Sequence, residues 1–345
     1  FAWLERHAHD GEHGGYWSFL NHKGQTITRV GSDWDQPLDP IGTPIGFKDM
    51  NVMSDLLEGL CALYMQWPDP VLRQRIATLT DIVVNKLLSH DGAVYFLASR
   101  DWRPVQHSVM IGNQMQTALR LVWAASCIGR GGLHIEDCLK LTDAAVRLGW
   151  EEDEGAFYYA TPGSPVTSVE AQDMVMRKKA WWVQVEALKT LLAASQLAPH
   201  RRDLFEKFER LNSFIEREIV DHQYGGSRPE PVKPSPSFRA LLRGARRPEF
   251  DTRKGYVWKD ASHEGRSWLT CMHLMRPGAR KAIERGPLFA FDPGVEGGLS
   301  ENQAPAGPSR FSRLAQTSLD PRAIHAMSVQ TWTMRCGRML VENSA

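Results

Sequence analysis

The chain has 345 residues, of which 42% are hydrophobic and 23% are charged, as is usual for a globular protein of one large domain or two smaller ones. Its 41 Lys and Arg residues are balanced by 40 Asp and Glu residues. This balance argues against nucleic acid or an anionic membrane as the main partner, since both attract a basic surplus. No apolar run approaches the roughly 20 residues that span a bilayer. We therefore expect a soluble protein that binds a small molecule.

The first residues already have the character of a helix interior, although the chain begins with Phe1. A helix is then predicted over 50–65, where apolar residues recur at helical spacing. The sequence Trp67-Pro68-Asp69-Pro70 ends this helix and starts another near 70–88. Similar patterns predict helices near 113–128, 134–149, 177–196, 201–220 and 260–276. The proline-rich segment 227–255 is predicted as a long loop, and residues 277–345 as an irregular tail.

Short turns that combine an acidic residue with glycine, usually beside aromatic residues, recur between these helices. Their glycines Gly15, Gly92, Gly155 and Gly226 are 77, 63 and 71 residues apart. Each repeat is thus two helices and a short hairpin, which indicates an array of helical hairpins over residues 1–276. A set of unrelated helical bundles with coincidental glycine turns is the alternative.

Five cysteines lack any C-x-x-C spacing, so neither a metal site nor a redox motif is expected. Cys61 and Cys127 lie in apolar helical runs and are predicted to be buried thiols. Such thiols suit a reducing compartment and hence a cytoplasmic protein.

Polar side chains cluster near the starts of four of the predicted helices. Taken singly, they fit N-capping, ion pairing or core packing. Their equivalent places in the repeats would instead bring them together at one end of a central cavity. Trp, amides, carboxylates and a histidine there would suit a neutral polyhydroxyl ligand. The clusters are Asn51, Asp55 and Glu58; Asn113 and Gln116; Lys179, Trp182 and Glu186; and Lys259, His263 and Arg266.

At these clusters the sequence resembles the N-acylglucosamine 2-epimerase superfamily, which includes cellobiose 2-epimerase and mannose isomerase. The resemblance covers about residues 1–276 and is most specific at 181–187 and 258–266. It implies an all-α, (α/α)6-toroid of twelve helices and sugar chemistry without a metal or other cofactor. Four repeats, where six close the ring, predict an incomplete ring of about four hairpins that lacks about two N-terminal ones. An open edge of this kind would expose apolar helix faces and make the isolated chain marginally stable.

Two motifs of the family are altered in this chain. The pattern N-x-H-x-H-x-x-E appears as Asn51 to Glu58, with Met53 and Asp55 in place of the histidines. The pattern G-H-x-x-E appears as Gly112 to Gln116, with Asn113 in place of histidine. The histidine of H-x-x-R is retained as His263.

Epimerisation at C2 needs two acid/base groups on opposite faces of a planar enediolate, and asparagine cannot be one of them. Aldose–ketose isomerisation needs one base, which His263 can supply. Asp55 would assist ring opening if burial raised its pKa. Substrate-binding roles are predicted for Asn51, Glu58, Asn113, Gln116, Trp182, Glu186, Trp258 and Arg266. We therefore expect a sugar isomerase, in homo-oligomeric or monomeric form; the alternative is a non-catalytic, sugar-binding or structural relative.

Overall fold

The computed structural model describes most of the first 231 residues and the last predicted helix. The described residues are 1–40, 42–105, 109–130, 132–161, 178–231, 255, 259, 261–275 and 283. Most of the predicted loop 227–255, Trp258 and, apart from Ile283, the predicted tail 277–345 lie outside them. The chain divides into one unit of residues 1–219 and 228–290 and another of 220–227 and 291–345.

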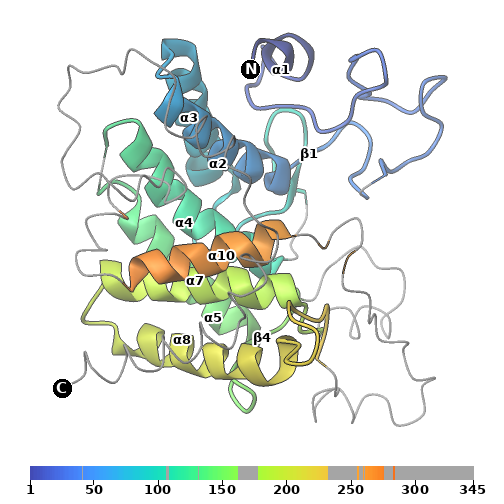
Figure 1. Cartoon of the computed structure of the whole chain (residues 1–345). Coiled ribbons are helices and arrows are strands. Elements are labelled where there is room, and N and C mark those ends of the chain that lie inside the picture. The colour runs from blue at the N-terminus through green and yellow to red at the C-terminus, as the bar shows by residue number, and fades with distance from the viewer. Residues whose placement is uncertain are drawn as a thin grey trace, which may run out of the picture. The chain divides into compact units, whose positions relative to one another are not determined.

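The first unit is built from antiparallel pairs of helices (Figure 1). Three complete pairs lie within the described residues. They are α2 (Met50–Gln66) with α3 (Pro70–Ile82), α4 (Ile111–Cys127) with α5 (Ile135–Gly149), and α7 (Trp181–Leu197) with α8 (Arg202–Phe214). The further helices α1 (Ala2–His7) and α10 (Ala261–Leu274) complete this set. The predicted helix bounds therefore agree with these helices to within about six residues.

The first helix of each pair lies in an inner layer and the second in an outer layer. Helix α4 packs between α2 and α7, and α7 packs in turn against α10, which lies alongside it in Figure 1. Every residue of α4 from Ile111 to Ala125 is buried, and α7 is buried over nearly its whole length. The core thus follows the inner helices, and their first turns, which carry the predicted site residues, lie at corresponding places in the array.

The four glycine turns form short antiparallel hairpins, as predicted. The first is closed by the bridge between His9 and Tyr16, the second by the bridge between Leu88 and Val94. The third pairs strands β3 (Trp150–Glu151) and β4 (Ala156–Phe157). Within the second unit, the fourth turn is closed by the bridge between Val220 and Ser227. The glycines in these turns have φ between +68° and +87°, a conformation that other residues rarely adopt.

Two features near these turns were not predicted. Helices α3 and α8 each end in a π-helical turn, η1 (Val83–Leu87) and η2 (Ile215–Ile219). Strand β1 (Lys48–Asp49), just before α2, pairs with β2 (Leu97–Ala98). Two-residue strands and single π-turns are too short to leave a periodic signal in the sequence.

Buried glutamines tie two of the hairpins to the inner helices. In the second repeat, the Gln114 side chain accepts from Val94 N at 2.8 Å and donates to Gly92 O at 2.5 Å. In the third, Gln184 accepts from Phe157 N at 2.9 Å and donates to Phe157 O at 2.8 Å. Both glutamines occupy the fourth position of their helix. Each therefore satisfies buried backbone groups of the hairpin and fixes the first turn of the helix that carries site residues.

The start of α2 is capped by a buried carboxyl group. Asp49 accepts hydrogen bonds from Val52 N at 2.7 Å and from the Thr43 hydroxyl at 3.2 Å. Burial raises the pKa of Asp49 to about 6, although these hydrogen bonds favour the carboxylate. A raised carboxyl pKa makes the folded state bind the proton more tightly than the unfolded state does. Ionisation of Asp49 therefore costs stability as the pH rises from about 4 to about 6.

The Asp49→Asn substitution tests this pH dependence. The amide can still cap the helix but does not ionise. The variant and the wild type should have similar unfolding free energies at pH 4. The variant should become more stable by roughly 3 kcal/mol, the equivalent of about two pKa units, once the pH exceeds 6. Urea denaturation at several pH values measures the difference in unfolding free energy between the variant and the wild type. A difference that becomes smaller as the pH rises would exclude ionisation of Asp49 as its cause.

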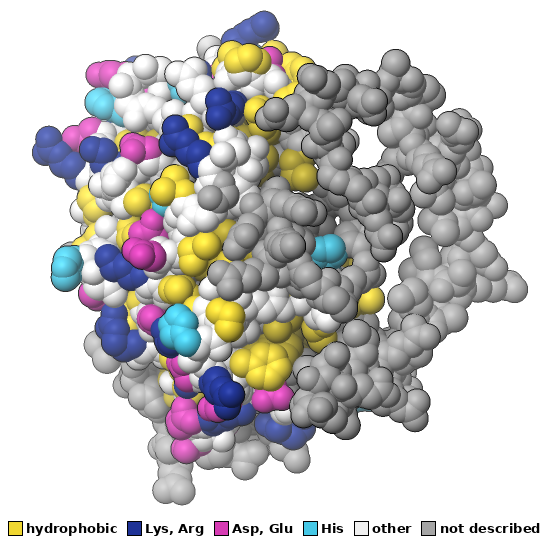
Figure 2. All heavy atoms as spheres, turned by 90° about the vertical axis from the view of Figure 1, so that its left-hand side faces the viewer, with side chains coloured by type: hydrophobic (Ala, Val, Ile, Leu, Met, Phe, Trp, Pro, Cys, Tyr) yellow, Lys and Arg dark blue, Asp and Glu magenta, His cyan; other side chains and the backbone are white. Residues whose placement is uncertain are grey.

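The described surface agrees with the balanced composition. On the face shown in Figure 2, acidic and basic side chains are interspersed. Among the described helices, none has both the length and the apolar character to cross a membrane. The thiol of Cys61 is buried, as predicted, whereas Cys127 is only partly buried.

Candidate active site

His263 lies in the first turn of α10 and is held by a carboxylate from α7. Its Nδ1 is 2.8 Å from Oε1 of Glu186 and 3.3 Å from Nε2 of Gln116 on α4. The fully buried carboxylate is the stronger acceptor, so Nδ1 carries the hydrogen and donates to Glu186. In the neutral imidazole this leaves Nε2 as an acceptor, to which none of the described residues forms a hydrogen bond. The His263 side chain is thus oriented by Glu186 and is 25% exposed.

Two tryptophans at the start of α7 pack against the imidazole. The ring centroids of Trp182 and His263 are 5.5 Å apart with the planes tilted by 38°, and Trp181 makes an edge contact at the same distance. Trp182 also lies against Gly112 of α4: a Cβ there would come within 2.0 Å of the indole. Gly112 is therefore required by the close approach of α4 to this ring. Trp181 is buried, whereas Trp182 remains partly exposed and offers a face on which a sugar ring can stack.

Behind the histidine lies a buried network of ion pairs. Arg266 bridges Glu58 of α2 at 3.0 Å and Glu186 of α7 at 3.2 Å. Lys189 is 2.5 Å from the second oxygen of Glu186, and Arg120 of α4 is 2.6 Å from Glu58. Burial raises the pKa of both glutamates, but the surrounding cations outweigh it, so each pKa is lowered and that of Glu186 lies well below its usual range. Both glutamates are therefore permanent anions near neutral pH.

Asp55 does not meet the condition on which its predicted role depends. Its side chain is 53% exposed and forms an ion pair with Arg120 at 2.7 Å. Residue 55 lies on the solvent side of α2, whereas Glu58, nearly one turn later, lies on the buried side, so Asp55 lacks the burial that its proposed role required.

The two asparagines predicted for the site contact each other. Asn113 Nδ2 donates to Asn51 Oδ1 at 2.5 Å, which links α4 to α2. Gln116, one turn further along α4, reaches His263. Amides therefore occupy the side of the cluster formed by α4 and the start of α2. Neither type of amide exchanges a proton at neutral pH.

The structure thus brings together most of the predicted residues. Asn51 with Asn113, and Glu58, Gln116, Trp182, Glu186, His263 and Arg266, are linked by the contacts above. Lys259 is buried, with its ammonium 4.6 Å from the Trp181 ring centroid and 3.5 Å from Glu264. Lys179 instead pairs with Glu151 and Glu154 beside the third hairpin. Trp258 lies outside the described residues.

Two residues of the network were missed in the sequence. Arg120 and Lys189 are among the most buried charged side chains, with 3% and 2% of their side chains exposed. Each interrupts an apolar run in the middle of an inner helix. A fully buried cation is rare without a partner. A cation that interrupts an apolar run was therefore the sequence signal for a buried ion pair at each position.

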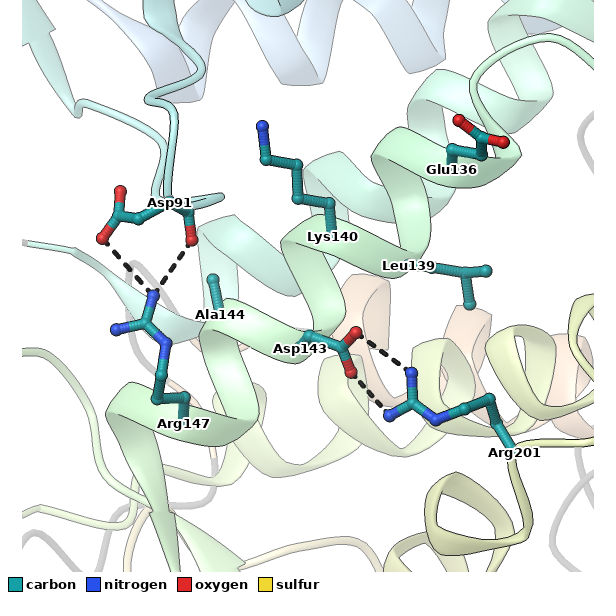
Figure 3. A pocket seen from close by; sticks show the side chains of 8 residues that line it. All are labelled: Asp91, Glu136, Leu139, Lys140, Asp143, Ala144, Arg147 and Arg201. Carbon is teal, nitrogen blue, oxygen red and sulfur yellow. Dashed lines mark hydrogen bonds and ion pairs between the residues drawn. The ribbon is translucent and has the colours of Figure 1, made fainter.

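A second concavity lies away from this cluster, along the outer helix α5 (Figure 3). It has a volume of about 470 Å³. Its arginines are already paired: Arg147 contacts Asp91, and Arg201 forms a bidentate pair with Asp143 at 2.7 and 3.0 Å. These groups are largely exposed and ordinary surface ion pairs explain them, so the groove does not compete with the His263 cluster as an active site.

The chemistry available at the cluster is proton transfer to and from a bound organic molecule. His263 is a positioned base, the Trp182 ring offers an apolar face, and the amides supply hydrogen-bond donors and acceptors. Among the described residues, no group of three or more His, Cys, Asp or Glu side chains is arranged to hold a metal ion.

Comparison with known proteins agrees with the resemblance seen in the sequence. Residues 119–230 match the family model described as N-acylglucosamine 2-epimerase (GlcNAc 2-epimerase). This segment contains Arg120, Trp182, Glu186 and Lys189 but not His263.

Solved structures of similar fold include two cellobiose 2-epimerases. The enzyme from Bacillus thermoamylovorans B4167 is 17% identical with a TM-score of 0.61, and the match covers 82% of this chain and 63% of that one. The enzyme from Spirochaeta thermophila DSM 6192 is 20% identical with a TM-score of 0.62 and coverages of 82% and 62%. A sugar epimerase from a ruminal bacterium is 18% identical with a TM-score of 0.61 and coverages of 82% and 63%.

The chain therefore spans less than two thirds of the length of these proteins, and the likeness shows the fold, an all-α toroid. Residues 119–230 thus match the N-acylglucosamine 2-epimerase family model, and the chain shares its fold with solved sugar epimerases.

Proposed function

We propose that this protein isomerises an open-chain aldose to the ketose through an enediolate, with His263 as the single base. The observation that carries the proposal is the geometry of His263. Its Nδ1 is committed to a permanent carboxylate, and its Nε2 is free to take a proton beside the tryptophan face. The family match over residues 119–230 and the fold shared with a sugar epimerase support a sugar as the substrate.

In this proposal, Nε2 of His263 removes the proton from C2, next to the carbonyl group, and returns it to C1 on the same face, while the hydroxyl proton of O2 passes to O1. The imidazolium that forms in between is stabilised by Glu186 through Nδ1. Arg266, already bound to two carboxylates, remains 23% exposed and is the nearest cation on α10 to the developing enediolate oxygen. Trp182 stacks on the sugar and holds it in position beside the base.

Epimerisation by two bases is disfavoured by the residues on the α4 side. A second base would have to deliver a proton to the opposite face of the enediolate, and the predicted site residues on α4 are the amides Asn113 and Gln116, which cannot do so. The direct test is product analysis by NMR after incubation with a panel of unphosphorylated aldoses. We expect the ketose as the first product, and a C2-epimeric aldose that forms earlier or faster would contradict the one-base route.

The Asn113→His substitution should introduce the missing second base. A histidine at this position would lose the hydrogen bond to Asn51 but gain a group that titrates near neutral pH. We expect a C2-epimerised aldose to become detectable, with ketose formation retained. Asn113→Gln keeps an amide and is the matched control, which should yield no epimer. If Asn113→His folds yet yields none, position 113 does not face the sugar.

The second candidate is a non-catalytic sugar-binding relative. The hydrogen bond between Asn113 and Asn51 favours it, because two amides paired with each other are suited to binding hydroxyl groups rather than to proton transfer. Sugar binding measured by calorimetry, without proton exchange at C2 of any bound aldose, would select this alternative.

A further inference from the structure

Lys189 is buried directly behind the carboxylate that orients His263. It follows Glu186 by three residues on α7, and its ammonium lies 2.5 Å from Oε2 while His263 is bound to Oε1. The contact between the two side chains is a buried ion pair. The Lys189 side chain is 2% exposed, and the ammonium lies 6.0 Å from the Trp123 ring centroid. A substrate cannot reach Lys189, so any effect on the reaction passes through Glu186.

We propose that Lys189 is a positioning residue that fixes the Glu186 carboxylate and competes with His263 for its negative charge, so that the imidazole stays neutral and able to accept a proton. This inference rests on the proposed role of His263 as the base. A carboxylate bound only to histidine would favour the imidazolium, which cannot act as a base. The cation on the far oxygen reduces that tendency without disturbing the hydrogen bond to Nδ1.

The charges around His263 come from four helices and are nearly balanced. On α7, Glu186 attracts the imidazolium and Lys189 repels it. On α10, Arg266 repels it, while Glu264 lies one residue along the chain and contacts Lys259. On α2 and α4, Glu58 and Arg120 form their own pair at 2.6 Å, and Gln116 is neutral. Lys189 and Arg266 are thus the two cations that share Glu186 with the histidine.

Burial lowers the pKa of Lys189 below its usual value, and Arg266 adds to this effect. The carboxylates of Glu186 and Glu58 act in the opposite direction and favour the ammonium. Lys189 and His263 bind the two oxygens of one carboxylate. At an effective dielectric constant of about 20, a unit charge at that separation shifts the histidine pKa by roughly one unit or more.

The test is the Lys189→Met substitution, with the pKa of His263 measured by NMR titration of histidine-labelled protein without any sugar. We expect the pKa of His263 to rise by about one unit or more. Lys189→Arg keeps the cation and should return the pKa close to the wild-type value. Lys140→Met removes an exposed lysine on the outer helix α5 and is the control that should leave it unchanged. If Lys189→Met does not fold, Lys189→Gln, which is polar but uncharged, carries the same expectation.

An unchanged or lowered pKa of His263 in a folded, uncharged variant would overturn the inference. The titration needs no substrate, so it separates this inference from the proposed function. If the titration shifts as expected and the wild type isomerises aldoses, the acidic limb of the kcat/KM profile should move to higher pH by the same amount. If no sugar reacts, the proposed function fails while the titration result on Lys189 stands.

Discussion

Replacing His263 with alanine is expected to lower aldose–ketose isomerisation by about two to four powers of ten, the usual contribution of a positioned general base. The substitution removes the proposed base, but it leaves Glu186 paired with Lys189 and Arg266. The protein should therefore still fold and bind sugar. Initial rates of ketose formation, measured beside sugar binding by calorimetry, separate the two effects.

His200→Ala is the matched control for this experiment. His200 lies in the exposed connection between α7 and α8, away from the cluster, and its removal should not change the rate. A His263→Ala variant that isomerises at the wild-type rate would show that the base is another residue.

Replacing Asp10 with asparagine is expected to destabilise the protein by about 4 kcal/mol, because it leaves a buried cation without its counter-ion. Lys48 is fully buried, with its ammonium 2.9 Å from Asp10 Oδ2 and 2.8 Å from Gly14 O. The rings of Trp17 and Trp102 lie 5.0 and 4.7 Å away. The amide of asparagine can still accept hydrogen bonds from the turn, so the substitution isolates the charge. Chemical denaturation at pH 7 measures the effect.

Two further variants check this origin. The double variant Asp10→Asn with Lys48→Met removes both charges and should recover most of the lost stability. Asp101→Asn removes an exposed acid paired with Arg103 and should cost less than about 1 kcal/mol.

Burial raises the pKa of Asp10, but the hydrogen bonds from Arg100 and Lys48 outweigh it and hold that pKa below its usual range. The stability difference should therefore persist above about pH 4 and shrink at lower pH. A difference that does not change with pH would point to the turn geometry instead.

The helices and glycine turns could be predicted because each leaves a local pattern in the sequence. The turn containing Gly155 illustrates this, since the glycine at φ +68° lies between two short strands that its position alone indicated. The convergence of Trp182, Glu186 and His263 followed from their equivalent places in the repeats. The π-helical turns did not follow, because helical periodicity does not report such short irregularities.

The electrostatic organisation of the site could not be predicted to the same extent. Helical spacing placed Asp55 and Glu58 on one face of α2, yet the first is half exposed and the second buried, because burial changes sharply across a single turn at the edge of the packed face. Arg120 and Lys189 lie in runs that resemble core helix, so their spacing of four from Gln116 and three from Glu186 did not single them out. Arg120 pairs with Glu58 of another helix, α2, whereas Lys189 pairs with Glu186 of its own helix.

The central claim, a single base at His263, is tested most directly with an aldose that carries deuterium at C2, incubated with the protein in ordinary water and followed by NMR. A single base moves the same hydrogen from C2 to C1, so we predict a ketose that retains part of the deuterium at C1, formed by the wild type and lost in His263→Ala. A C2-epimeric aldose with a solvent-derived proton at C2, formed by the wild type as the main product and equally by His263→Ala, would contradict the account.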